Sequence, residues 1–233
     1  MARLDSRNLK GLIVAVLAAW FLWETPLVYP VRLFSTMCHE SGHALAALAT
    51  GGRVGSIQVA PNTAGLTTTA GGFPLAVVSG GYLGSVFFGC GIIMLASDRR
   101  FSRYVLESLG ALFLVLTVCY ARDSFTALYG LATGIALWKI GRTASAETEF
   151  YIAQTLGVLT ASMALMDIRT LLPGAGILVG VGGAPGVTDA QQLARMTHIP
   201  ATFWALLWAA ISLGAVFWVL RRSLDRRAGS MEI

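Results

Sequence analysis

Residues 35–48 read STMCHESGHALAAL, an apolar stretch in which His39, Glu40 and His43 stand within five positions. Positions i and i+4 lie one above the other on the same face of a helix. Two imidazoles in this arrangement can share one zinc ion, with Zn–N distances of about 2.0–2.1 Å. Glu40 points in a neighbouring direction, from which a carboxylate can act on a water molecule without binding the metal itself. The stretch therefore predicts a helix with His39 and His43 as zinc ligands and Glu40 as the catalytic base.

The apolar surroundings favour a metal over the simpler interpretation, a pair of hydrogen-bonded core histidines next to a glutamate. An ionisable group in the middle of a membrane costs roughly 2.5–3.5 kcal/mol on insertion scales. Three such groups in one short stretch need a compensating interaction, and a bound divalent cation provides it.

The composition indicates an integral, multi-pass membrane protein. The chain has 233 residues, of which 55% are hydrophobic and 12% are charged, whereas soluble domains carry about 25% charged residues. The charges gather in short clusters between long apolar stretches, and a membrane helix needs about 20 mainly apolar residues. The net charge of +5 does not indicate a nucleic-acid partner, because the basic residues stand at the ends of the apolar segments. We expect the lipid bilayer, most simply the cell membrane, to surround the protein.

The fold class predicted from these segments is an all-α membrane protein, a polytopic helical bundle of about six to seven spans in a single membrane-embedded domain over residues 1–233. Residues 53–72, rich in Gly, Thr and Val, predict a small β-hairpin directly after the HESGH helix. An open hairpin edge cannot lie in lipid, so the hairpin is expected at the interface or against protein. The apolar segments are expected at about residues 12–27, 31–50, 73–96, 104–120, 125–140, 150–172 and 201–220, with a glycine-rich loop at 173–185.

Two histidines do not complete a catalytic zinc site, which needs a third protein ligand and an open position. The acids in apolar surroundings are Asp189 and Asp167. We favour Asp189 as the third ligand and keep Asp167 as the alternative. Asp189 opens a short helix, where it could instead serve as an N-cap. The remaining histidine, His198, is expected to be structural.

Small residues recur at four-residue spacing in the segment that follows the hairpin, at Gly80, Gly84, Ser85 and Gly89. Such faces allow two helices to approach closely. We expect this segment to pack tightly against the HESGH helix and to support the site.

Three pieces of the chain resemble the site-2 protease family of membrane-embedded zinc metalloproteases, and most closely its peptidase M50B-like branch. They are STMCHESGHALAAL at 35–48, SGGYLGSVFFG at 79–89 and TDAQQLARMTHIPATFWALLW at 188–208. The resemblance implies an intramembrane metalloprotease core, in which His39 and His43 are zinc ligands, Glu40 is the base and an aspartate on a late helix is the third ligand.

The leading functional prediction is a zinc-dependent intramembrane endopeptidase that hydrolyses peptide bonds of membrane-associated protein or peptide substrates, with water activated by zinc and Glu40. The alternative is a catalytically inactive metal-binding membrane scaffold. Glu40 favours the enzyme, because metal binding alone needs the histidines and not the glutamate. A transporter would be expected to show symmetric halves with broken helices, and the sequence contains no such repeat.

Overall fold

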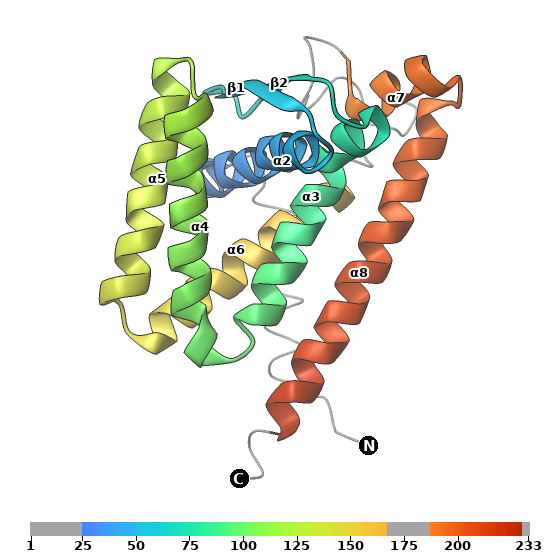
Figure 1. The fold of residues 1–233 in the computed structure, drawn as a ribbon. Helices are drawn as coiled ribbons and strands as arrows, with labels where there is room; N and C mark the ends of the chain where they lie inside the picture. Colours follow the sequence, from blue (N-terminus) through green and yellow to red (C-terminus); the bar gives the residue numbers. More distant parts are fainter. Residues whose placement is uncertain (1–24, 167–186, 230–233) are drawn as a thin grey trace.

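The computed structural model describes residues 25–166 and 187–229, and within them the chain is mainly helical (Figure 1). The described residues form seven helices and one β-hairpin, which lies between the first two of these helices. In chain order the elements are α2 (Tyr29–Ala49), β1 (Arg53–Val59), β2 (Gly65–Ala70), α3 (Pro74–Leu95), α4 (Arg99–Tyr120), α5 (Ser124–Thr143), α6 (Ala146–Met166), α7 (Asp189–Thr197) and α8 (Ala201–Gly229). The helical class and the position of the hairpin agree with the sequence prediction.

Three of the described helices are long and apolar enough to cross a membrane, as expected for a multi-pass membrane protein. They are α3, α4 and the part of α8 over Ala201–Val219. The total of six to seven spans stays a prediction. The segment expected at residues 12–27 lies almost entirely outside the described residues, as does the glycine-rich loop expected at 173–185.

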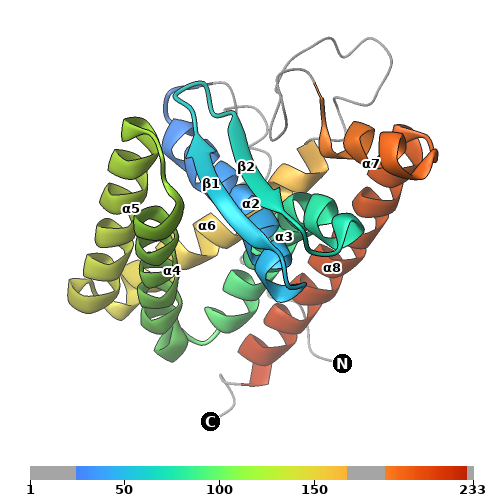
Figure 2. The same cartoon turned by 45° about the horizontal axis from the view of Figure 1, so that its top comes forward.

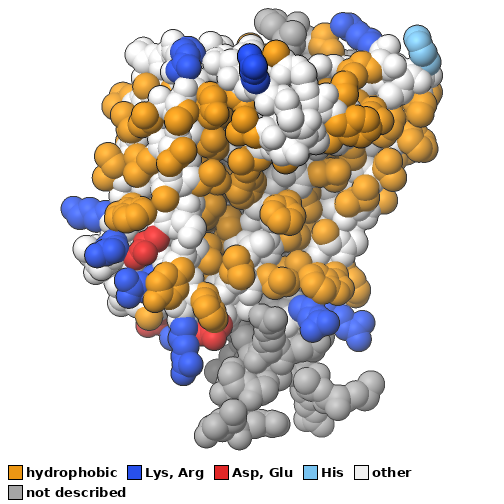
Figure 3. Space-filling view, in the orientation of Figure 1, with side chains coloured by type: hydrophobic (Ala, Val, Ile, Leu, Met, Phe, Trp, Pro, Cys, Tyr) orange, Lys and Arg blue, Asp and Glu red, His pale blue; other side chains and the backbone are white. Residues whose placement is uncertain are grey.

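The surface agrees with a membrane setting. Hydrophobic side chains cover the middle of the face in Figure 3, and basic side chains gather mainly toward its lower end. In Figure 1 the α3–α4 connection, the α5–α6 connection and the C-terminal end of α8 all lie at that lower end, whereas the hairpin and α7 lie at the upper end. The basic clusters near residues 99–103, 139–142 and 221–222 therefore share one end of the helices.

The hairpin pairs β1 with β2 in antiparallel register, from Arg53 opposite Ala70 to Val59 opposite Gly65. It lies against protein: the Thr36 hydroxyl on α2 donates to the Thr63 carbonyl at 2.8 Å, and the Val59 amide donates to the Thr126 hydroxyl on α5 at 2.7 Å. In Figure 2, β2 lies between β1 and α7. The hairpin thus covers α2 and presents β2 toward α7.

Glycine allows α2 and α3 to touch through their backbones. A Cβ atom at Gly84 would lie 2.8 Å from the Gly42 Cα, and one at Gly80 would lie 2.8 Å from the Gly42 carbonyl oxygen. Real Cβ atoms essentially never approach another heavy atom this closely. The predicted close packing of this small-residue face on the HESGH helix is therefore present, and it fixes the distance between the two helices at the site.

Candidate metal site

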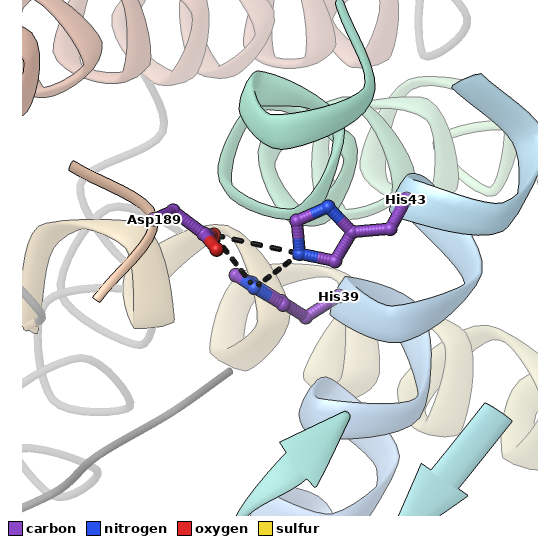
Figure 4. Close-up of side chains that lie close together, drawn as sticks. All are labelled: His39, His43 and Asp189. Carbon is purple, nitrogen blue, oxygen red and sulfur yellow. Dashed lines mark hydrogen bonds and ion pairs between the residues drawn. The ribbon is translucent and has the colours of Figure 1, made fainter. Parts of the chain in front are cut away.

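Three side chains from two distant parts of the sequence converge at one point (Figure 4). The Nε2 atom of His39 lies 3.1 Å from Oδ2 of Asp189, and Nε2 of His43 lies 3.5 Å from the same oxygen. The two Nε2 atoms are 3.2 Å apart. Ligand atoms about 2.0–2.1 Å from a tetrahedral zinc ion are separated by about 3.3–3.4 Å. The three atoms therefore have the spacing that a single zinc ion requires.

Asp189 is free to face the histidines because its neighbour caps the helix. Thr188 is the N-cap of α7: its hydroxyl accepts from the Gln191 amide, and the Gln191 side chain accepts from the Thr188 amide at 3.0 Å. This reciprocal pair is a capping box. Asp189 is the first residue of the helix and only 6% exposed, so its carboxylate turns inward toward α2 instead of capping α7.

A backbone carbonyl orients His43. Its Nδ1 atom lies 2.7 Å from the Val77 carbonyl oxygen at the start of α3. A carbonyl can only accept, so Nδ1 carries the hydrogen, and in the neutral ring Nε2 keeps its lone pair for the cluster. A second hydrogen bond of this kind is the usual support of a metal-binding histidine.

The carboxyl of Asp189 is ionised at neutral pH. Burial alone raises the pKa of this group, but the charge of a protonated His43 and hydrogen bonds from both imidazoles lower the pKa to about 2. The cluster therefore depends on a shared positive charge, which either an imidazole proton or a metal cation can supply.

The space beside the two Nε2 atoms exists because residue 81 on α3 is a glycine. A Cβ atom at Gly81 would contact Nε2 of both histidines and would lie 2.6 Å from Cε1 of His43. Any larger residue would fill the position that a metal needs. The donor set and this open position together fit a zinc ion.

Glu40 is held by the hairpin. Its Oε2 atom accepts a 2.7 Å hydrogen bond from the Thr67 hydroxyl on β2, which also lies 3.1 Å from the Glu40 carbonyl oxygen. Its Oε1 atom is buried and has no hydrogen-bond partner among the described residues. A Cβ atom at Gly65 would contact Oε1. One carboxylate oxygen is thus held by Thr67, while the other lies against the backbone at Gly65 without a hydrogen-bond partner among the described residues.

The site opens into a cavity of about 470 Å³ that both Glu40 and His43 line. Thr67 and Thr69 of β2 form one wall, and Gln192 and Arg195 of α7 contribute to another. This volume lies within the range of about 300–1,000 Å³ that is usual for ligand sites.

Of the other predicted candidates, one lies apart from this cluster and the other cannot be placed. Asp167, the alternative third ligand, lies outside the described residues. His198 is exposed and forms the C-cap of α7 in the left-handed conformation, with φ 60°. Sequence reasoning missed Gly81, Thr67, Gly65 and the Val77 carbonyl. Only Gly81 had a signal, because it stands within the small-residue stretch SGGYLGS.

Replacing Asp189 with Asn is expected to weaken zinc binding by at least about 10–100-fold, the loss typical of removing a group that merely supports a ligand. The amide keeps the shape but loses the negative charge. Zinc affinity is measured by competition with a chromophoric chelator, followed by metal analysis. Asp98→Asn is the matched control, because Asp98 caps α4 and Asn caps helices equally well. Equal zinc affinity in the two variants would exclude Asp189 as a ligand.

Comparison with known proteins gives one match over most of the chain. The family described as Peptidase M50B-like matches residues 12–219. No curated protein and no solved structure matches the chain significantly.

Proposed function

The chain belongs to the Peptidase M50B-like family, and on that basis we propose that it is a zinc-dependent intramembrane endopeptidase that cuts membrane-associated proteins, most simply in the cell membrane. Family membership implies a metallopeptidase-like hydrolase. The observation that carries the finer proposal is the convergence of His39, His43 and Asp189 next to a cavity that Glu40 lines.

The proposed ligands are Nε2 of His39, Nε2 of His43 and the carboxylate of Asp189. Two imidazoles and one carboxylate with a further open position are a donor set typical of catalytic zinc. When bound, zinc would supply Lewis acidity that makes water a better nucleophile near neutral pH and polarises the substrate carbonyl.

Glu40 is proposed as the base that moves the proton. Its Oε1 atom takes a proton from water, and the same carboxyl then passes the proton to the leaving amine. The Thr67 hydrogen bond holds Oε2, and Oε1 is the oxygen left without a partner among the described residues. Burial of Glu40 excludes bulk water, so the carboxylate is not screened by solvent during the transfer.

The hairpin is proposed to present the substrate. Within the described residues β2 pairs only with β1, and Leu66, Thr67 and Thr69 of β2 line the cavity. An extended peptide can add to such a strand edge through main-chain hydrogen bonds. A membrane-spanning substrate would have to unwind locally to bind in this way. Binding along β2 would bring its scissile bond close to Glu40, because Thr67 of β2 is hydrogen-bonded to Glu40.

Thr67→Val is expected to lower kcat by about tenfold or more, because a hydrogen bond to a charged group is worth about 1.5–3 kcal/mol. Valine keeps the shape of the side chain and removes the hydroxyl. Thr67→Ser keeps the hydroxyl and is expected to restore most of the rate. Steady-state kinetics should show a change in kcat larger than that in KM. A normal kcat in Thr67→Val, or an equal loss in Thr67→Ser, would contradict this positioning role.

The proposal is tested by incubating purified, zinc-loaded protein in bilayers with membrane-spanning peptides and comparing it with Glu40→Gln. We expect hydrolysis that depends on both zinc and Glu40. Stoichiometric zinc without cleavage of any peptide would instead indicate the metal-binding scaffold.

A further inference from the structure

Arg195 lies on the face of α7 that lines the candidate catalytic cavity. Gln192, Arg195 and Met196 are at spacings of three and four residues and all line it, as expected for one face of a helix. α7 is anchored in the protein by other residues, because Asp189, Ala190 and Leu193 are buried. The helix therefore holds Arg195 at the cavity while Asp189 reaches the histidines.

Among the side chains that the structure describes, no acid forms an ion pair with Arg195. Among the described residues, Glu40 is the only acid that lines the cavity, and it is fully buried and hydrogen-bonded to Thr67. Arg195 itself is exposed. It can therefore meet an incoming group at the mouth of the cavity.

With zinc bound, the two charges of the ion would offset the carboxylates of Glu40 and Asp189. Among the charged residues described at the site, the positive charge of Arg195 would then remain. A guanidinium presents several N–H donors in a fixed planar arrangement that matches a carboxylate. The neighbouring Gln192 amide can add a donor of its own.

We propose that Arg195 binds a carboxylate of the substrate, so that the protein selects peptides with an acidic group close to the scissile bond. This inference rests on the proposed peptidase function and gives it a substrate class. Arg195 also stands in the last turn of α7, where a cation stabilises the helix end. That structural role alone would change stability without changing which peptides bind, so the test must measure selection.

The test uses Glu40→Gln protein, loaded with zinc and placed in nanodiscs of phosphatidylcholine, whose neutral headgroups add no net charge. A pool of random peptides, acetylated at the N-terminus and amidated at the C-terminus, is equilibrated with the protein. The retained peptides are then sequenced by mass spectrometry. We expect Asp and Glu to be enriched about fivefold or more among retained peptides, because a hydrogen bond between charged groups contributes enough free energy for such a preference. Adding Arg195→Gln should abolish the enrichment, and Arg195→Lys should keep part of it.

Arg53→Gln is the matched control, because Arg53 is an exposed arginine that begins β1 and does not line the cavity. It should leave the enrichment unchanged. A second pool with free C-termini separates the two sources of a carboxylate. Retention of free termini that depends on Arg195, regardless of Asp and Glu content, would identify the terminal carboxylate as the bound group.

Three results would overturn the proposal: no peptide retained, no preference for carboxylates, or a preference that survives Arg195→Gln. Because the Glu40→Gln protein does not need to cleave anything in this assay, these results are distinct from a failure of the peptidase function. That function is tested separately by hydrolysis with unmodified Glu40.

Discussion

Glu40→Gln is expected to reduce peptide-bond hydrolysis by about 10²–10⁴-fold, the contribution typical of a general acid–base group. Glutamine keeps the size of the side chain and can still accept from the Thr67 hydroxyl, as Oε2 of Glu40 does at 2.7 Å. It cannot take a proton from water at pH 7. The initial rate of cleavage of a membrane-spanning peptide, measured at saturating zinc, is the observable.

The zinc content of Glu40→Gln provides the internal control. The proposed ligands are His39, His43 and Asp189, so the variant should bind as much zinc as the unmodified protein. Lost zinc would mean that Glu40 is itself a ligand. Unchanged cleavage of every substrate would remove Glu40 from the mechanism.

Gly81→Ala is expected to lower zinc affinity by at least about 100-fold, more than the 10–100-fold cost of losing an outer group that supports a ligand. The added methyl would contact Nε2 of both His39 and His43, so the rings must turn away from their shared point. Alanine favours a helix over glycine by about 0.5–1 kcal/mol, so α3 itself should not be weakened. Zinc titration and the far-ultraviolet circular dichroism spectrum measure the two effects.

Gly91→Ala is the matched control on the same helix. A Cβ atom at Gly91 has no heavy atom within 4 Å, and this position lies a few turns from the histidines. We expect its zinc affinity and helix content to equal those of the unmodified protein. If Gly81→Ala also bound zinc normally, the metal position inferred from the three side chains would be wrong.

The spacing of His39 and His43 was enough to predict that their side chains meet, because a helix turns by a fixed angle per residue. The proposed third ligand could not be predicted in this way. Asp189 and Asp167 both stand in apolar surroundings, and the residues next to them in the sequence do not indicate which one contacts the histidines of α2. The structure brings Asp189 to the histidines, and the reason is a capping box at Thr188 that leaves Asp189 unengaged.

Gly81 and Thr67 show a different limit. The four-residue repeat of Gly80 and Gly84 predicted a close helix contact, but which glycine faces the histidines depends on the rotation of α3 about its axis. Thr67 is one of three successive threonines in β2. Only the register of the hairpin, with Thr67 opposite Ile57, selects it as the partner of Glu40.

Most of the fold followed from apolar length and turn residues. The hairpin predicted at residues 53–72 forms at Arg53–Val59 and Gly65–Ala70, because both strands contain residues that favour strands, such as Val, Ile and Thr, and are bounded by glycines. Counting spans was harder. Helices such as α5 and α6 carry basic or acidic residues near their ends, and their length alone does not separate a membrane span from a packed helix.

The central claim is that His39, His43 and Asp189 bind one zinc ion. The most direct test is anomalous scattering at the zinc edge from crystals of the zinc-loaded protein. We predict a single peak about 2.0–2.2 Å from both Nε2 atoms and from a carboxylate oxygen of Asp189. A peak bound by the two histidines with Asp189 beyond bonding distance, or no peak beside the histidines at all, would contradict the account.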